Sequence, residues 1–513
     1  MTEEQASYRQ IIKATSIFGG VQVFNIIISI IRSKFVAVLL GTTGMGIMGL
    51  LVSTTNIISS LTNMGLNTSA VKDIASAYQT GDEKRIGIIA TVIWKLVWIT
   101  GLIGLIVTAI LSPWLSELSF GNKNYTLAFI WLSATLLFNQ LTNGQLVILQ
   151  GLRKLNYLAK ANLSGSFIGL FVTLPLYYIW GIDGIVPGLI GSALISLLMS
   201  WYFSRKIKFN KPILSRPQTI AEGKNMLRMG LMISLSGLLG VSAAYIIRIF
   251  INRTGGIEQV GLYNAGFTII NTYVGLIFNA MATDYYPTLS SVAHDNKLCK
   301  QTINQQAEIT LLILAPILII FLVFINWVII LLYSKQFIDV NDMIYWAALG
   351  MFFKAASWSI SFIFLAKSTG KLFFWNELIA TFILLTLNLL GYHFWRLTGL
   401  GISFAVAYLL YLIQVFIISK IKFEFSFTKS FVNLFIVQFS LAIVSFFVVK
   451  FFETPYNYFL GIILVVVSFR YSIKELDKRM GIISKLKDLI FIIGLGKFRS
   501  LFKSLFKKNK SVQ

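Results

Sequence analysis

Apolar runs of about 20 residues recur along almost the whole chain, which is the length needed to cross a hydrocarbon layer as an α-helix. Short segments with charged residues, glycine or proline separate them. The first half contains runs near Ala14–Leu40, Gly44–Leu66, Ile86–Leu111, Thr126–Leu149, Ala161–Ile179 and Ile185–Phe203. The second half contains Met226–Ile251, Val260–Ala282, Ala307–Leu332, Met343–Leu365, Phe373–Tyr392, Leu400–Ile418, Phe431–Val449 and Tyr456–Tyr471. The pattern predicts an all-α integral membrane protein with about 14 transmembrane helices.

Composition supports the bilayer as solvent. Hydrophobic residues make up 56% of the chain and charged residues 12%, whereas a soluble domain carries roughly 25% charged residues. The formal charge is +24, but the basic residues lie mainly in loops and at the C-terminus. We therefore expect contact with anionic membrane lipids rather than nucleic acid.

The distribution of Lys and Arg predicts the orientation. Basic residues cluster in the segment 205–225 and after the run that ends at Leu149, while alternate loops such as Gly181–Gly184 have none. The positive-inside rule then places both termini in the cytoplasm, which requires an even number of crossings. The expected location is a bacterial inner membrane.

Several chemistries lack the residues that they require. Cys299 is the single cysteine, and the two histidines, His294 and His393, are far apart in sequence, so we expect no metal site and no cofactor. The segment 205–225 has neither a histidine nor paired carboxylates, and no Gly-rich loop ending in Gly-Lys-Ser/Thr occurs. A membrane glycosyltransferase, polymerase or ligase is therefore disfavoured, and we expect a transporter rather than an enzyme.

The chain repeats itself at a spacing of about 215 residues. Trp180 and Gly184 precede a Lys-Ile-Lys-Phe segment, and so do Trp395 and Gly399; Gly46 similarly matches Gly261. Because each repeat contains six helices, both enter the membrane in the same orientation, and the predicted symmetry is a pseudo-two-fold along the membrane normal. Two like bundles enclose a central cavity, which is typical of transporters.

The repeat predicts how the chain is divided. The predicted parts are an N-terminal six-helix bundle (1–204), a cytoplasmic linker (205–225), a C-terminal six-helix bundle (226–422), two further helices (423–473) and a basic tail (474–513). Within the tail, Leu501, Phe502, Leu505 and Phe506 share a helical face with lysines beside it. This favours a surface-lying amphipathic helix, although a solvated basic tail fits equally well.

Three stretches carry a family resemblance: Gly19-Gly20-Val21-Gln22 through Arg32, Leu40 to Gly46, and Leu149-Gln150-Gly151-Leu152-Arg153-Lys154. With them, the chain resembles polysaccharide flippases of the O-antigen translocase type, in the multidrug/oligosaccharidyl-lipid/polysaccharide exporter superfamily. The resemblance covers roughly residues 10–475. It implies a two-lobed bundle that moves an undecaprenyl-diphosphate-linked oligosaccharide to the periplasmic leaflet, with a polysaccharide polymerase and a chain-length regulator as partners.

Charged residues inside membrane helices are the candidates for binding an anionic diphosphate, because they cost about 2.5–3.5 kcal/mol each at a helix centre. The candidates are Arg32, Lys95, Arg248 and Lys354, with Gln140 and Asn143 as polar lining. Snorkelling to the surface is the alternative for the arginines and Lys354. Interhelical hydrogen bonds explain the two amides equally well.

Two other transport functions remain open. A peptidoglycan-precursor flippase would also carry a diphosphate, and sequence separates it poorly from the first interpretation. A multidrug antiporter would share the fold but usually needs buried acids, and none of the 20 acidic residues falls centrally in a predicted helix.

Overall fold

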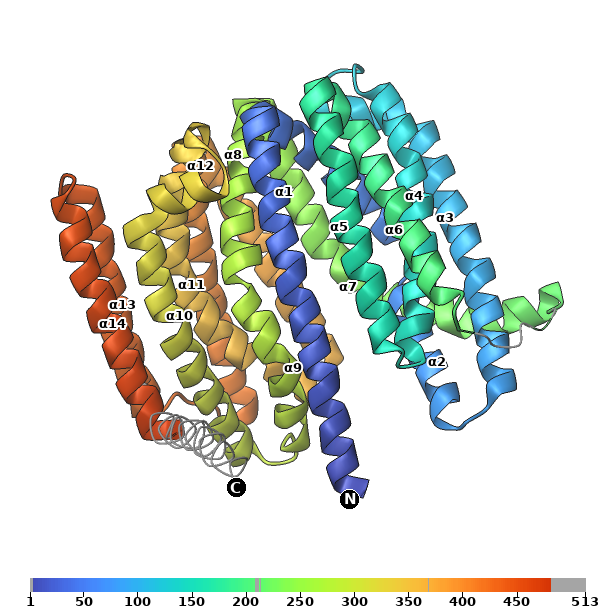
Figure 1. Cartoon of the computed structure of the whole chain (residues 1–513). Helices are drawn as coiled ribbons and strands as arrows, with labels where there is room; N and C mark the ends of the chain where they lie inside the picture. The colour runs from blue at the N-terminus through green and yellow to red at the C-terminus, as the bar shows by residue number, and fades with distance from the viewer. Residues whose placement is uncertain (1–2, 208–211, 213, 368, 481–513) are drawn as a thin grey trace, which may run out of the picture. The chain divides into compact units, whose positions relative to one another are not determined.

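The computed structural model describes residues 3–207, 212, 214–367 and 369–480 and shows no β-strand there (Figure 1). The described chain forms two compact units. One comprises Met1–Ala280, Ile325–Gly350 and Ser368–Gln414, and the other Met281–Phe324, Met351–Lys367 and Val415–Gln513. The predicted basic-tail residues 481–513 lie outside the described residues.

Helices make up nearly all of both units. The first half contains α1 Glu3–Thr62, α2 Leu66–Gln79, α3 Glu83–Phe120, α4 Thr126–Gly151, α5 Leu155–Trp180, η1 Gly181–Gly184 and α6 Ile185–Ser204. The second half contains α7 Arg216–Gly255, α8 Ile257–Phe267, the π-helical η2 Thr268–Val274, α9 Leu276–Ser291, α10 Asn296–Leu332, η3 Lys335–Val340, α11 Asn341–Ala366, α12 Gly370–Phe423, α13 Lys429–Phe451 and α14 Tyr456–Met480.

The all-α membrane class is confirmed. Among the described residues, eight helical segments are long and apolar enough to cross a membrane, and some of them contain two helices. One example is Leu155–Ser204, where the short η1 turn connects α5 to α6 and the two helices pack against each other. The count of 14 helices remains a prediction.

Backbone kinks recur at one spacing and reveal the internal repeat. Gly41 interrupts α1 with φ 65° and ψ −164°, and Gly256, 215 residues later, separates α7 from α8 with φ 87° and ψ 170°. Gly181 (φ 55°, ψ −128°) and Arg396 (φ 51°, ψ −134°) form a second pair at the same offset. An arginine at positive φ is strained. The repeated architecture, rather than the residue type, therefore determines the backbone conformation at this position.

The two repeats contact each other through matched residues. A Cβ atom on Gly46 would lie 2.1 Å from the carbonyl oxygen of Ile257, and one on Gly261 would lie 2.0 Å from that of Thr42. Adding 215 to Gly46 gives Gly261, and subtracting 215 from Ile257 gives Thr42, so exchanging the two repeats turns one contact into the other, as expected on a two-fold axis. Only glycine permits this approach of α1 to α8. We call it the glycine crossing.

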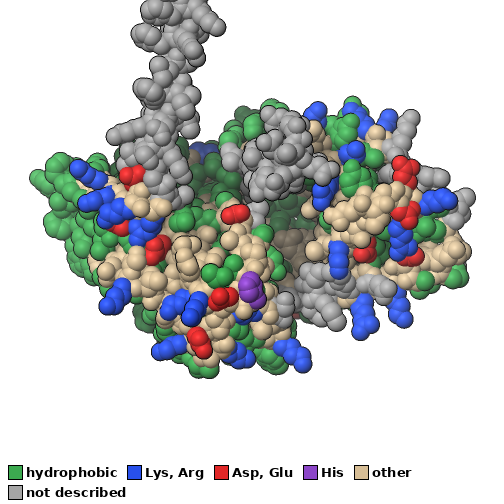
Figure 2. Space-filling view, turned by 90° about the horizontal axis from the view of Figure 1, so that it is seen from below, with side chains coloured by type: hydrophobic (Ala, Val, Ile, Leu, Met, Phe, Trp, Pro, Cys, Tyr) green, Lys and Arg blue, Asp and Glu red, His purple; other side chains and the backbone are tan. Residues whose placement is uncertain are grey.

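One end of the first unit is strongly basic. Figure 2 looks at the end where α1 begins and shows Lys and Arg side chains spread over it, with fewer Asp and Glu. Exposed residues near the ends of α4, α5 and α6 contribute to this surface; they are Lys154, Lys160, Arg205 and Lys206. We call it the basic face, and it gathers the loops from which the orientation is predicted.

Polar contacts hold α14 within the second unit. Gln438 on α13 bonds Ser468 and Ser472, which are buried on α14. At the end of α14, Arg479 forms salt bridges of 2.7 Å with Glu308 on α10 and with Glu475. Glu308 is thus satisfied by a cation far away in sequence. The helix runs nine residues beyond the predicted end at Tyr471, because this cluster stabilises its polar last turns.

Candidate functional site

Arg32 and Arg248 lie at similar depths in the first unit. Arg32 is nine residues before the Gly41 kink, and Arg248 is eight residues before Gly256. At 1.5 Å per residue, both are roughly 12–14 Å from the turn that follows them. Both side chains are half-buried. One cation from each repeat therefore lies well inside the apolar part of the helices.

Arg248 is held in a fixed orientation on α7. Its Nε atom donates to the side-chain oxygen of Asn264 at 2.8 Å, and an Nη atom donates to the carbonyl oxygen of Ala244 at 2.9 Å. The guanidinium also lies 5.4 Å and 5.6 Å from the ring centroids of Tyr263 and Phe267, within the range of cation–π attraction. None of these neighbours neutralises the charge.

Arg32 is less completely satisfied. Its Nε atom is buried and bonds to no residue that the structure describes. The phenol of Tyr177 on α5 interacts electrostatically with it. Lys34, two residues further on, differs: its ammonium donates to the carbonyl oxygens of Ile330 and Tyr333 at 2.7 Å and 2.6 Å. Lys34 thus stabilises a helix end, whereas Arg32 keeps donor capacity.

Neither arginine forms a salt bridge with a carboxylate in the described ranges. A buried cation normally requires an anionic partner, because desolvation is costly. Uncompensated positive charge at this depth is suited to an anionic ligand. At the offset of 215 that relates the kinks, Arg248 corresponds to Ser33, so the two guanidinium groups are one residue out of register.

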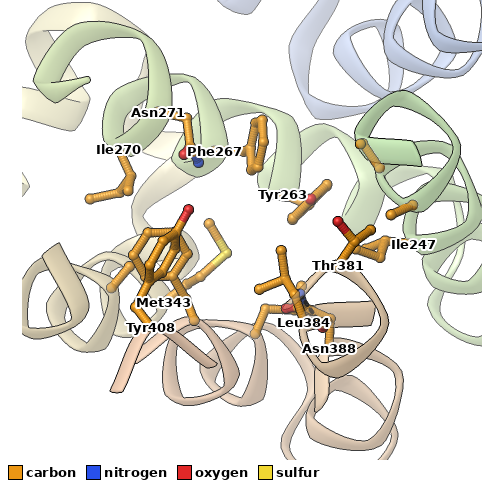
Figure 3. A pocket seen from close by; sticks show the side chains of 16 residues that line it. Ile247, Tyr263, Phe267, Ile270, Asn271, Met343, Thr381, Leu384, Asn388 and Tyr408 are labelled. Carbon is orange, nitrogen blue, oxygen red and sulfur yellow. Dashed lines mark hydrogen bonds between the residues drawn. The ribbon is translucent and has the colours of Figure 1, made fainter. Parts of the chain in front are cut away.

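A cavity of about 170 Å³ lies beside Arg248, enclosed by α7, α8, η2, α11 and α12. Figure 3 shows Tyr263, Phe267 and Asn271 facing Tyr408, Leu384 and Asn388 across it. The lining is mostly apolar. This volume is below the 300–1,000 Å³ of typical ligand pockets, so the cavity does not accommodate an oligosaccharide. The rings of Tyr263 and Phe267, which contact Arg248, form part of the cavity wall. The shape of the cavity therefore depends on the position of Arg248.

Lys95 on α3 binds the segment that joins the repeats. Its ammonium donates to the carbonyl oxygen of Leu214 at 2.9 Å and to the hydroxyl of Thr219 at 3.1 Å. These bonds orient the start of α7, which begins at Arg216, ten residues before the predicted start at Met226. A capping box between Ser215 and Gln218 starts the helix there.

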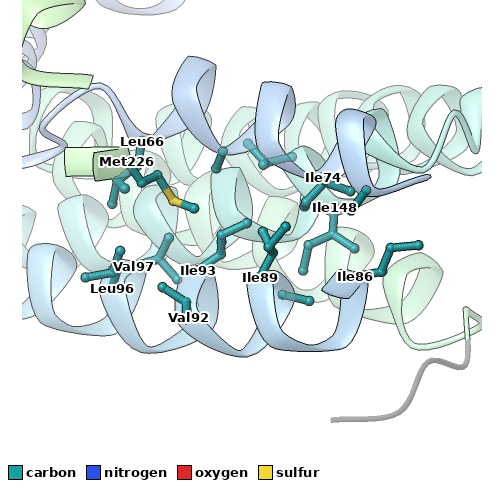
Figure 4. Packing of buried hydrophobic residues seen from close by; sticks show 14 of the residues in the cluster. Leu66, Ile74, Ile86, Ile89, Val92, Ile93, Leu96, Val97, Ile148 and Met226 are labelled. Atoms are coloured by element: carbon teal, nitrogen blue, oxygen red, sulfur yellow. The ribbon is translucent and has the colours of Figure 1, made fainter. Parts of the chain in front are cut away.

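The first turns of α7 belong to the core of the first bundle. Figure 4 shows Met226 packed with Leu66 of α2 and with Leu96 and Val97 of α3. At its exposed side, Arg85 binds Glu222 through two bonds of 2.6 Å and 2.7 Å. The hydrogen bond from Arg85 lowers the pKa of the Glu222 carboxyl. Lys95 therefore has a structural role: it binds the predicted linker next to this packed segment.

Lys354 lies at the middle of α11 and is half-buried, as its predicted depth requires. It belongs to the second unit, whereas Arg32, Lys95 and Arg248 belong to the first. Its neighbours in sequence, Phe352 and Phe353, pack on Phe435 and Phe439 of α13. The role of Lys354 in binding stays a prediction.

The two amides on α4 differ. Gln140 is 4% exposed and donates to the side-chain oxygens of Asn63 at 3.1 Å and Thr100 at 2.9 Å. Asn143 is half-buried and makes no side-chain hydrogen bond within the described residues. Gln140 therefore connects α4 to α1 and α3, and Asn143 is the better candidate for contact with a polar ligand.

We expect Gln140→Leu to destabilise the protein by about 1–3 kcal/mol, because the buried Thr100 and the half-buried Asn63 both lose a donor. Asn143→Leu should leave thermal stability nearly unchanged and lower transport instead. Melting curves of the purified variants, together with surface polysaccharide in cells, separate the two roles. Equal destabilisation by both substitutions would contradict this assignment.

Sequence reasoning missed two residue types at this site. Asn264 binds Arg248, and its amide also donates to the carbonyl oxygen of Met45 at 3.3 Å, so it connects the arginine to the glycine crossing. Tyr177 and Tyr392 are fully buried tyrosines 215 residues apart. The offset that matches Trp180 with Trp395 is the signal that would have found the tyrosine pair.

Comparison with known proteins places the chain among exporters. A family described as polysaccharide biosynthesis protein matches residues 35–342, which is more than half of the chain. A Shigella flexneri protein named "Putative O-antigen transporter" is 24% identical over 338 residues, covering 64% of this chain and 78% of the relative.

Solved structures show the fold. An inward-facing multidrug resistance transporter of the MATE family and MOP superfamily superposes with a TM-score of 0.67 at 16% identity, covering 80% of this chain and 98% of that one. The lipid II flippase MurJ in its inward closed conformation superposes with a TM-score of 0.61 at 13% identity, covering 91% and 99%. The predicted superfamily resemblance is confirmed, and the chain belongs to the polysaccharide biosynthesis protein family.

Proposed function

We propose that the protein is a flippase that translocates an undecaprenyl-diphosphate-linked oligosaccharide, the repeat unit of O-antigen or a similar surface polysaccharide, by alternating access. The observation that carries the proposal is the pair Arg32 and Arg248, which place uncompensated positive charge inside the helices of both repeats. A diphosphate is the anionic part of such a cargo, and guanidinium groups bind phosphate bidentately.

The glycine crossing supports the alternating-access part of the proposal. It holds α1 and α8 in backbone contact at the end opposite the basic face, so the repeats are closed there. We place the basic face in the cytoplasm, with both termini on that side of a bacterial inner membrane. The crossing must then separate for the cargo to leave toward the periplasm.

The membrane potential is the proposed energy source for this direction of movement. An inside-negative potential favours outward transfer of an anion by about 2.3 kcal/mol per charge per 100 mV. The driving force requires that the arginines stay with the helices while the cargo crosses. A flux that does not depend on membrane potential would contradict this coupling.

Two other cargoes share the fold. The superposition on the lipid II flippase favours a peptidoglycan precursor as the second candidate, because its head also carries a diphosphate. A cationic drug is a poorer fit, since the two arginines would repel it. A polysaccharide polymerase and a chain-length regulator remain the proposed protein partners.

The direct test measures on which leaflet the lipid-linked oligosaccharide accumulates in cells that lack the protein. We expect accumulation on the cytoplasmic leaflet, rescue by the wild type, and poor rescue by Lys354→Ala at equal expression. If the oligosaccharide reaches the outer leaflet normally without the protein, the flippase proposal is wrong.

A further inference from the structure

A second cavity, of about 240 Å³, opens among α3, α4 and α6 near the basic face. Its wall combines two tryptophans, Trp94 and Trp201, with the hydroxyls of Thr91 and Ser204 and with Arg205. Neither Arg32 nor Arg248 lines it. Aromatic rings, hydroxyls and a cation therefore meet at the end of α6, where the membrane interface is expected.

One residue that lines this cavity is a buried glutamine. Gln145 on α4 is 3% exposed and lines the wall. Its oxygen accepts a hydrogen bond of 2.6 Å from Ser200, which fixes the amide and leaves the nitrogen as donor. That nitrogen donates to no residue in the part of the chain that the structure describes. Because Gln145 lines the cavity and Ser200 fixes its amide, the nitrogen offers an oriented donor to an acceptor group there.

Aromatic rings hold two cations in place directly after α6, and one of them, Arg205, lines the cavity. The guanidinium of Arg205 lies 4.7 Å from the Trp201 ring centroid, and the ammonium of Lys206 lies 4.2 Å from the Tyr202 centroid. Cation–π contact positions these groups without cancelling their charge. No carboxylate lines the cavity among the residues that the structure describes. Its electrostatic preference is therefore for an anion.

We propose that this cavity binds the phosphate headgroup of an anionic membrane phospholipid. Basic pockets between transmembrane helices on the cytoplasmic side are suited to such headgroups. Arg205 and the Gln145 amide would bind the phosphate oxygens, while Trp94 and Trp201 contact the glycerol and the first acyl carbons. The volume suits a single phosphate and not a diphosphate with several sugars. The proposal stands whether or not the cargo is an oligosaccharide.

The test uses the full-length protein in detergent and measures phospholipid binding by native mass spectrometry. We expect phosphatidylglycerol to bind well above phosphatidylcholine, and Arg205→Gln to weaken phosphatidylglycerol about tenfold, the loss of one charge-assisted hydrogen bond. Arg205→Lys should keep part of the affinity. Lys160→Gln is the matched control, because it removes one exposed charge near the same face outside the cavity and should leave the affinity unchanged.

Three outcomes would overturn the proposal. Equal weakening by Arg205→Gln and Lys160→Gln would mean that the lipid responds only to net charge. Equal binding of phosphatidylglycerol and phosphatidylcholine would exclude an anion site. Binding of a polyprenyl phosphate without phosphatidylglycerol would assign the cavity to the cargo lipid. Because Arg205 is exposed, its substitution should not impair folding, and a melting curve checks this.

Discussion

Replacing Arg32 or Arg248 with glutamine will lower translocation of the lipid-linked oligosaccharide by about tenfold or more, and replacing both will nearly abolish it. Each guanidinium is expected to form charge-assisted hydrogen bonds to the diphosphate worth about 1.5–3 kcal/mol, which is about 10- to 150-fold in binding. Glutamine keeps a donor but removes the charge. Flux into the outer leaflet of proteoliposomes measures the effect.

Arg253→Gln is the matched control for these variants. Arg253 lies on α7 as Arg248 does, but it is exposed and donates to the carbonyl oxygens of Glu117 and Leu118. We expect its flux to stay within about twofold of the wild type, as for most surface substitutions. Lysine at position 32 or 248 should restore part of the flux. If the glutamine variants transport normally, the arginines are only snorkelling cations and the proposed binding site is wrong.

Alanine at Gly46 or Gly261 will open the contact between α1 and α8. A Cβ atom there would approach a backbone oxygen at 2.0–2.1 Å, so the helices must move apart, at a cost of about 1–3 kcal/mol. In the proposed transport cycle the crossing separates when this end opens, so we expect the equilibrium to shift toward the open conformation. We expect the variants to melt earlier and to transport poorly.

A cysteine at Ser53 reports this opening. Ser53 lies seven residues beyond Gly46, on the same face of α1 and about 10 Å deeper. The native Cys299 is buried and should not react. A membrane-impermeant maleimide added from the periplasmic side should label Ser53→Cys several times faster in the Gly46→Ala background.

Gly237→Ala serves as the control for the glycine crossing. A Cβ atom at Gly237 has no neighbour within 4 Å, and alanine in a helix interior is favourable by about 0.5–1 kcal/mol. This variant should label like the wild type and melt no earlier. Unchanged labelling in Gly46→Ala would show that the crossing does not control access.

The membrane class and the repeat could be predicted because both depend on local pattern. Apolar runs define spanning helices. The matched tryptophans Trp180 and Trp395 lie at the two kinks that the structure shows near Gly181 and Arg396. The start of α7 could not be predicted in this way, since its first turns are polar and are stabilised by a capping box and by Arg85. Hydropathy alone locates only the apolar part of such a helix.

The candidate site was only partly accessible to sequence reasoning. Cations inside apolar runs identified Arg32 and Arg248, but the partners of each cation depend on long-range packing. Lys95 bonds residues 119 and 124 positions away, and Gln140 bonds Asn63 from 77 positions away. No local pattern encodes such distances. For the same reason Asn264, which orients Arg248, appeared only with the coordinates.

The reciprocal glycine contact also bears on how such a chain can arise by gene duplication. A single repeat that paired with a second copy of itself would place identical residues opposite each other on the symmetry axis. Thr43 faces Glu258 there, 215 residues apart, at 3.3 Å. In a self-paired ancestor with glutamate at that position, two carboxylates would repel each other. Fusion into one polypeptide lets the two copies diverge, so one position can accept a hydrogen bond that its counterpart donates.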